Sequence, residues 1–153
     1  MLKIVIGIFI VIGCFFAGAS YSVVYKKRMK FYELLSAFNS ELKRNLVFRR
    51  ENVSTVLKSK PEYALFADIY KIIANEGEFT KIEYLTPDEN EYVCDYFSSI
   101  GKRDGEAEEQ FLDYSEEVIK SEMERCAVDN KKYKSLGEKL GLSFGLVIFV
   151  LIL

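Results

Sequence analysis

The sequence predicts an all-α protein, in which a helical bundle with one long antiparallel helix pair is flanked by an N-terminal and a C-terminal membrane helix. Apolar residues in the middle of the 153-residue chain recur at intervals of three and four, the period of a helix face. Both ends of the chain are apolar and nearly uncharged. In the last third, an apolar side chain recurs every seventh residue over about three heptads, as in helices that pack on another long helix.

The two apolar ends differ in length. Residues 4–25 form a run of 22 uncharged residues, which as a helix would cover about 33 Å and cross a bilayer core. Residues 140–153 cover only about 21 Å. Counted from Leu136, this second run gains a turn that includes Glu138 and Lys139, whose long side chains can reach back to the membrane interface. We therefore predict a transmembrane helix at residues 1–25 and a spanning or deeply inserted helix at residues 140–153.

Basic residues follow the first apolar run and precede the second. Because Lys and Arg close to a membrane helix hold that side in the cytoplasm, residues 26–139 are predicted to form a cytoplasmic helical domain anchored at both ends. The same charges favour an uncleaved anchor over two alternatives. One is a signal peptide cleaved near residues 17–19, and the other is a lipoprotein anchored through Cys14.

Between the anchors, helical periodicity predicts a series of helices. The first apolar stripe continues from the membrane helix to Leu46, and a short turn-and-a-half follows at residues 53–57. Pro61, at a first helical position, opens the next helix, and Gly77 closes it.

Two more helices complete the bundle. Residues 86–89 (TPDE) form a capping box, which opens a helix that ends at Gly101. The last helix begins near Asp104 and is expected to return antiparallel against the first. Its heptad positions are Leu112, Ile119, Cys126 and Tyr133.

The composition excludes several classes of function. The chain has no histidine, so it has no imidazole base, no His-containing catalytic triad and no imidazole metal site. Its acidic clusters lack the histidines that a di-iron bundle requires. It contains neither a CxxC pair nor a glycine-rich phosphate loop. We therefore expect no enzyme activity, no catalytic residues, no metal and no cofactor.

The net charge of −2 hides an asymmetry. Residues 26–60 hold ten Lys and Arg against three Glu, whereas residues 61–130 hold six basic and 19 acidic residues. One interpretation is topology control and solvated helix faces. The other is a basic collar for anionic lipid headgroups and an acidic docking surface for a basic partner. We expect no nucleic-acid partner, because so acidic a domain would repel phosphate over most of its surface. The predicted collar consists of Lys26, Lys27, Arg28, Lys30, Lys131, Lys132 and Lys134, and the predicted docking residues are Asp104, Glu106, Glu108 and Glu109.

Small residues recur every fourth position near both ends. Gly137, Gly141 and Gly145 share one face of the last helix, and Gly13 and Ala17 have the same interval in the first. Small residues at this spacing let membrane helices approach closely. We predict that these five residues form a helix-packing face, either within the chain or between copies.

The layout of the chain, with two stretches of its last third, resembles the stage III sporulation protein AB family. Residues 97–104 (FSSIGKRD) are similar to the family's F-x-x-x-G-x-x-D stretch, with Gln110 in the next helix. Residues 133–137 (YKSLG), then Gly141 and an aliphatic terminus, are similar to its closing signature. The N-terminal half matches only in pattern, since residues 45–57 lack the usual tyrosine and Thr-Pro-Leu.

The resemblance implies a function that composition does not. The family belongs to sporulating Firmicutes and to the apparatus that connects mother cell and forespore. Its cytoplasmic domain is similar to that of the inner-membrane platform protein of type II secretion and type IV pilus systems, which couples an ATPase to the membrane assembly. The family has no known catalytic residues.

By this resemblance we expect a non-catalytic platform or scaffold subunit in the mother-cell (outer forespore) membrane. Its expected partners are an ATPase similar to stage III sporulation protein AA, other channel membrane proteins and membrane lipids, with homo-oligomers left open. The alternative is a membrane-bound sensor or regulator that binds a soluble ligand in its bundle. Such a sensor would require a sizeable apolar pocket with a few convergent polar groups.

Overall fold

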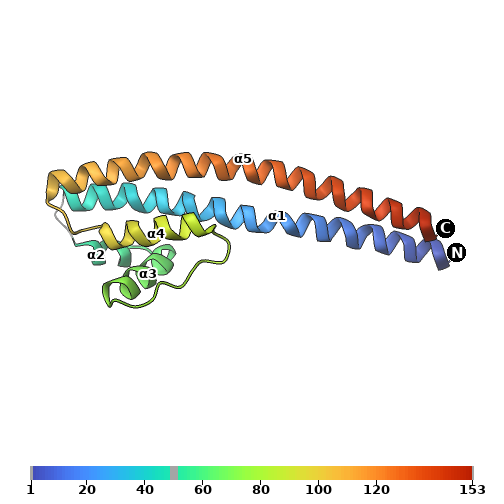
Figure 1. Cartoon of the computed structure of the whole chain (residues 1–153), viewed down its shortest axis with the longest axis horizontal. Coiled ribbons are helices and arrows are strands. Elements are labelled where there is room, and N and C mark those ends of the chain that lie inside the picture. The colour runs from blue at the N-terminus through green and yellow to red at the C-terminus, as the bar shows by residue number, and fades with distance from the viewer. Residues whose placement is uncertain (1, 49–51, 153) are drawn as a thin grey trace. The chain divides into compact units, whose positions relative to one another are not determined.

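The computed structural model describes residues 2–48 and 52–152, and these residues form helices joined by turns and by a longer connection at residues 75–86 (Figure 1). No β-strand occurs in these two ranges, and the predicted all-α class is confirmed. The elements are α1 (Leu2–Lys43), a π-helical segment (Arg44–Phe48), α2 (Val53–Lys58), a 3-10 turn (Pro61–Tyr63), α3 (Ala64–Ala74), α4 (Pro87–Ser99) and α5 (Gly105–Ile152).

Contacts divide the chain into two units. Unit 1 contains Met1–Met29 and Glu124–Leu153, and unit 2 contains Lys30–Met123. Each unit therefore holds a segment of α1 and a segment of α5. The predicted boundaries after residues 25 and 139 refer to a membrane surface rather than to internal contacts, and they stay predictions.

The core of unit 2 is an aromatic cluster centred on Phe38 of α1. Its ring centroid lies 5.2 Å from that of Tyr63, 5.4 Å from that of Phe66 and 5.9 Å from that of Phe97. All four side chains are almost completely buried. Each buried aromatic side chain contributes roughly 1.5–3 kcal/mol of transfer free energy, so this cluster holds α3 and α4 against α1.

The α2–α3 region follows the sequence prediction with one correction. The buried residues of α2 are Val53, Val56 and Leu57, as its spacing predicts. Gly77, however, is not the left-handed residue that ends α3. Glu76 takes that conformation with φ 54°, and the Gly77 N–H donates to the Ile72 carbonyl at 2.8 Å. The sequence predicts the closing turn at the glycine. In the structure the left-handed residue of that turn lies one position earlier in the chain.

The capping box at α4 is confirmed. Thr86 Oγ1 accepts a hydrogen bond from the Glu89 N–H, and the Glu89 carboxylate accepts one from the Thr86 N–H at 2.8 Å. The buried Asn90 adds a feature that the sequence pattern does not predict. Its amide donates to the Leu85 and Thr86 carbonyls, and its Oδ1 accepts from the Ile82 N–H at 2.7 Å. This side chain ties the preceding loop to α4.

Within unit 2, α1 and α5 run antiparallel, as predicted. Asn39 Nδ2 donates to the Leu112 carbonyl at 3.0 Å. One turn further along α1, Lys43 forms ion pairs with Asp113 and with Glu109, the latter at 3.7 Å. The heptad residues of α5 in this unit, Leu112 and Ile119, are fully buried.

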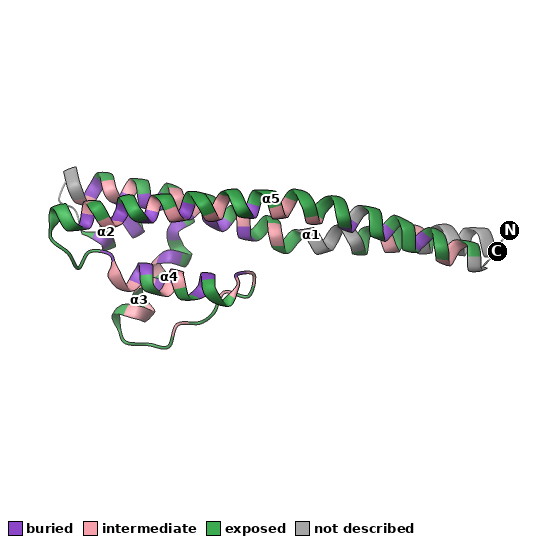
Figure 2. Cartoon of the chain, turned by 45° about the horizontal axis from the view of Figure 1, so that its top comes forward, coloured by how far each residue is buried: buried purple, intermediate pink, exposed green. Residues whose placement is uncertain are grey.

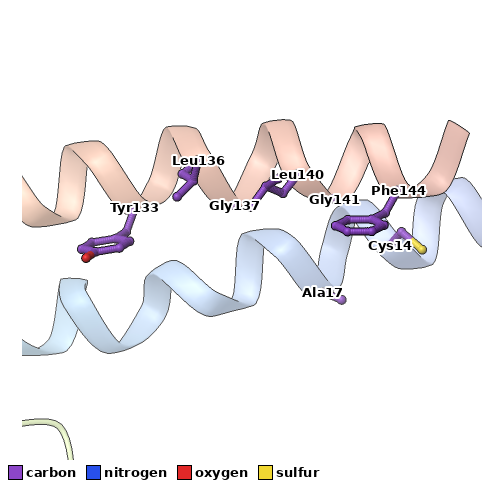
Figure 3. A pocket seen from close by; sticks show the side chains of 8 residues that line it. All are labelled: Cys14, Ala17, Tyr133, Leu136, Gly137, Leu140, Gly141 and Phe144. Carbon is purple, nitrogen blue, oxygen red and sulfur yellow. The ribbon is translucent and has the colours of Figure 1, made fainter. Parts of the chain in front are cut away.

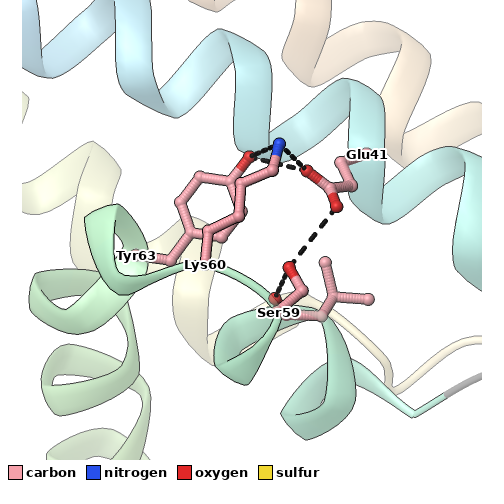
Figure 4. A network of polar contacts seen from close by, with 5 residues as sticks. Glu41, Ser59, Lys60 and Tyr63 are labelled. Carbon is pink, nitrogen blue, oxygen red and sulfur yellow. Dashed lines mark hydrogen bonds and ion pairs between the residues drawn. The ribbon is translucent and has the colours of Figure 1, made fainter.

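A polar network connects α1 to the segment between α2 and α3 (Figure 4). Glu41 Oε2 accepts hydrogen bonds from Lys60 Nζ at 2.6 Å and from the Tyr63 hydroxyl at 2.8 Å. The Ser59 hydroxyl donates to the other carboxylate oxygen at 3.4 Å. The hydrogen bond from Lys60 lowers the pKa of Glu41, and the same bond raises the pKa of Lys60.

This network predicts a specific pH dependence of stability. Because the pKa of Glu41 is lower in the folded chain, its contribution is complete above the unfolded pKa and is lost as the pH falls through the folded one. The variant Glu41→Gln should therefore lose less stability than the wild type between about pH 6 and about pH 3. Urea denaturation at several pH values measures this. Glu33→Gln, at an exposed position of the same helix, should retain the wild-type acid dependence; equal slopes for both variants would contradict the assignment.

Candidate functional site

Unit 1 is an antiparallel pair formed by the N-terminal part of α1 and the C-terminal part of α5. The Tyr25 and Tyr133 rings are stacked, with centroids 4.3 Å apart and planes at 12°. A β-carbon on Gly145 would lie 3.0 Å from the α-carbon of Val11. Since Val11 precedes Tyr25 on α1 whereas Gly145 follows Tyr133 on α5, the two apolar ends of the chain lie side by side.

The small residues predicted as a packing face occupy different positions in this pair. Gly137, Gly141 and Gly145 are all buried along α5. On α1, Gly13 and Ala17 are exposed, and no atom lies within 4 Å of where a Gly13 β-carbon would be. An interval of four identifies one face of a helix but not the direction in which that face points. The structure therefore places only the α5 glycines inside the helix contact.

This difference predicts opposite results for one substitution at two glycines. Gly145→Ala should destabilise the helix pair by about 1–2 kcal/mol, because its β-carbon would meet backbone that cannot yield as a flexible side chain can. Gly13→Ala should leave stability unchanged or slightly higher, since the site is open and alanine restricts the unfolded chain. Thermal unfolding of the full chain in detergent micelles, followed by circular dichroism, compares them. Equal losses would show that the Val11 contact does not limit the approach of the helices.

An open apolar groove runs along this helix pair (Figure 3). It has a volume of about 420 Å³. Its lining residues are Cys14 and Ala17 from α1, and Tyr133, Leu136, Gly137, Leu140, Gly141 and Phe144 from α5. The buried glycines leave the space, and the larger residues of α5 flank it.

The predicted basic collar is exposed with one exception. Lys26, Lys27, Lys131, Lys132 and Lys134 of unit 1 are exposed, as is Lys30 of unit 2. Arg28 is only 8% exposed, and its guanidinium lies 3.8 Å from the Asp129 carboxylate. Its assignment to lipid headgroups was therefore wrong, because its charge is used in an ion pair between the two helices.

Exposed large apolar side chains are concentrated in unit 1. Figure 2 marks exposed residues of every type in green. Phe9, Phe16 and Phe144 are 71%, 64% and 63% exposed, and Val150 is 70% exposed. Among the residues whose burial is described, unit 2 contributes only Leu65 and Tyr114 to the exposed large hydrophobic side chains. Within the described ranges, no helix reaches the length and hydropathy expected of a membrane span.

The predicted acidic docking residues do not form one surface. Asp104 and Glu106 are exposed, and Glu109 is half-buried beside Lys43. Glu108 is only 4% exposed, and its carboxylate accepts hydrogen bonds from the Gly101 N–H at 2.7 Å and the Arg103 N–H at 3.3 Å. Including Glu108 was therefore wrong, because this side chain satisfies the backbone donors of the turn between α4 and α5.

Two exposed features of unit 2 were missed from the sequence. On α4, Asp88, Glu91 and Asp95 are exposed, and this helix contains no Lys or Arg. On α5, Tyr114 is 65% exposed and lies near Gln110 and Glu117 along the same face. Their spacings of three and four residues could have identified both faces. Among the residues described, no three Cys, Asp or Glu side chains come together to hold a metal ion.

Comparison with known proteins supplies the family. No curated protein and no solved structure matches the chain significantly. The family model described as stage III sporulation protein AB matches residues 3–153, which is almost the whole chain and includes both units. The chain therefore belongs to the stage III sporulation protein AB family.

Proposed function

We propose that the chain is a non-catalytic platform subunit that is anchored in a membrane through unit 1 and presents unit 2 to a cytoplasmic ATPase. Membership of a stage III sporulation family is consistent with a role in sporulation. The finer proposal is a subunit of the apparatus between mother cell and forespore, in the mother-cell (outer forespore) membrane. Its ATPase partner would be similar to stage III sporulation protein AA.

The observation that carries membrane attachment is the contrast in exposed apolar surface between the units. A two-helix unit with exposed phenylalanine and aliphatic side chains along both helices is unfavourable in water, because its apolar surface stays hydrated. Large exposed apolar surfaces mark membrane or protein contacts. The stacked Tyr25 and Tyr133 are of the residue type enriched at membrane interfaces. From Tyr133 to Ile152, α5 rises about 29 Å, close to the roughly 30 Å of a bilayer core. The charged residues of this stretch, Lys134, Glu138 and Lys139, all lie in its first two turns, where long side chains can reach the interface.

Attachment and orientation can be tested on membranes. The full chain should remain with the membrane fraction after an alkaline wash that releases peripheral proteins. In inverted vesicles, protease should digest unit 2, whereas in intact spheroplasts unit 2 should be protected. Release by the alkaline wash would remove the anchor, and digestion only from the outside would reverse the proposed orientation.

For partner docking we propose the face of α5 that contains Glu106, Gln110, Tyr114 and Glu117, hereafter the α5 docking face. Tyr114 is the most exposed aromatic side chain described in unit 2. Tyrosine is enriched among the residues that dominate binding energy at protein interfaces, and exposed carboxylates steer a basic partner. The face replaces the four acidic residues proposed from the sequence, and it keeps Glu106 from that set.

Binding of the full chain in micelles to the purified ATPase tests this face. Tyr114→Ala should weaken binding about 30-fold, the effect of losing a hot-spot residue. The double variant Glu106→Lys, Glu117→Lys should also weaken binding, and by a larger factor at low salt than at high salt, because salt screens the charges. Leu65→Ala and the pair Asp88→Lys, Glu91→Lys serve as matched controls on α3 and α4. If only the α4 variants weaken binding, the partner uses α4. If the folded proteins do not bind at any salt concentration, the docking function is removed.

The alternative function, a sensor with a ligand inside its bundle, has less support. The centre of unit 2 is filled by large side chains that contact one another. Six of its aromatic residues are at most 2% exposed: Tyr32, Phe38, Tyr63, Phe66, Tyr96 and Phe97. This packing favours a rigid platform.

A further inference from the structure

The groove of unit 1 has the length of a single acyl chain in one leaflet. From Tyr133 to Phe144 it follows α5 over about 16 Å. One leaflet contributes half of a hydrocarbon core that is about 30 Å thick, or about 15 Å. Gly137 and Gly141 of α5 leave space along the groove, and Leu140 and Phe144 are exposed beside it.

The groove is polarised along its length. At the Tyr133 end, Lys132 Nζ lies 5.7 Å from the centre of the Tyr133 ring, and the exposed Lys131 and Lys134 are close to Tyr133 along α5. Lys26 and Lys27, also exposed, follow Tyr25, whose ring stacks on that of Tyr133. The exposed Lys139 is the last charged residue before Phe144 on α5, and residues 4–25 and 140–153 contain no charged side chain, so the Phe144 end itself is uncharged.

We infer that this groove binds an anionic phospholipid, with one acyl chain lying between Tyr133 and Phe144 and the headgroup among the exposed lysines at the Tyr133 end. The inference rests on the proposed membrane attachment of unit 1. An apolar channel with cationic groups at one end is complementary to this class of amphiphile in both shape and charge.

A lipid fits this groove better than a helix from a second copy does. Gly145, which would allow close helix approach, is already packed against Val11 of the same chain. Leu140 and Phe144, 48% and 63% exposed, stand beside the groove and would hold the backbone of another helix away. Two copies meeting here would also bring their lysine clusters within a Debye length of about 8–10 Å, where like charges repel.

The test uses tryptophan fluorescence, because the chain contains no natural tryptophan. Phe144→Trp places an indole in the groove, hereafter the groove reporter, and Leu142→Trp places one on the same helix outside the lining, hereafter the control reporter. Each full-length variant is reconstituted into vesicles of equal amounts of phosphatidylcholine and phosphatidylglycerol. Two preparations are compared. In one the acyl chains of phosphatidylglycerol are brominated, in the other those of phosphatidylcholine, and bromine quenches the indole fluorescence. We expect phosphatidylglycerol to quench the groove reporter about threefold more strongly than phosphatidylcholine, and both lipids to quench the control reporter equally.

Two further changes are made in the Phe144→Trp background. Ala17→Leu fills the groove from an exposed position of α1, and the pair Lys131→Gln, Lys132→Gln removes the charge at its end. Each should abolish the preference for phosphatidylglycerol. The pair Lys81→Gln, Lys102→Gln removes the same charge from unit 2 and should leave the preference intact. Circular dichroism confirms that every variant retains its helices.

Each remaining outcome overturns the inference in a recognisable way. Equal quenching of the groove reporter by both lipids, or a preference that survives both groove variants, would remove the lipid site while leaving the membrane anchor in place. Quenching of neither reporter by either lipid would remove the anchor itself. Cross-linking of Cys14 to Cys14 between copies, with the groove reporter shielded from both lipids, would show that a second copy occupies the groove.

Discussion

Replacing Gly101 with alanine is expected to destabilise the chain by about 2–4 kcal/mol, from two additive causes. Gly101 follows α4 with φ +73°, a left-handed conformation that costs a residue with a β-carbon roughly 1–2 kcal/mol. A β-carbon there would also lie 2.6 Å from Cγ2 of the buried Val53, closer than two carbon atoms can approach. To relieve this contact, either the turn must move away from α2 or the Val53 side chain must leave its rotamer.

The two causes can be separated by urea denaturation. Gly105→Ala is the matched control, because no atom lies within 4 Å of its β-carbon position and it starts α5. This variant should be as stable as the wild type or slightly more stable. Combining Gly101→Ala with Val53→Ala should cost less than the sum of the single changes, because the second removes the clashing methyl group. Strict additivity would mean that the backbone conformation alone accounts for the loss.

Asn39→Ala is expected to cost a similar amount, about 2–4 kcal/mol, because it removes the central residue of a buried hydrogen-bond chain. Asn39 is fully buried on α1. Its Oδ1 accepts from the Tyr96 hydroxyl of α4 at 2.8 Å, and its Nδ2 donates to the Leu112 carbonyl of α5. Burial raises the pKa of Tyr96 well above its ordinary value, so the hydroxyl stays protonated and able to donate. Without Asn39, that hydroxyl loses this acceptor in the core.

A double-mutant cycle with Tyr96→Phe tests this arrangement. If the hydrogen bond is the main interaction between the two side chains, Asn39→Ala with Tyr96→Phe should be less destabilising than the sum of the single changes. Ser40→Ala, at an exposed position next to Asn39, is the control and should be nearly neutral. Additive losses in the cycle would indicate that cavities, rather than the hydrogen bond, determine the cost.

Local signals were sufficient for several elements. The capping box of α4 was correct because the side chains of Thr86 and Glu89 bond to backbone groups only three residues away. The short helix α2 and the antiparallel return of α5 followed from apolar spacing, which reports the period of a buried face. The end of α3 was missed by one residue, because glycine is the commonest but not the only residue in the left-handed position.

Charged residues of the candidate sites were predicted less well. Arg28 and Glu108 were placed on surfaces with their charged neighbours, but both are buried. Each side chain binds a partner that sequence patterns do not reveal. Arg28 forms an ion pair with Asp129 on the other helix, and Glu108 accepts hydrogen bonds from backbone N–H groups of a turn. A charged side chain is buried only where such a partner exists, and the partner is set by the fold.

By itself, the sequence determined the helical class, most helix limits, the heptad seam of α5 and the apolar character of both chain ends. These depend on residue spacing and on contacts within one or two helical turns. Only the tertiary structure decided that Asn39 joins α1, α4 and α5, that the α5 glycines are buried while Gly13 is open, and that a groove lies beside them. The physical reason is that periodicity defines a helix face, whereas the partner of that face depends on contacts between distant segments.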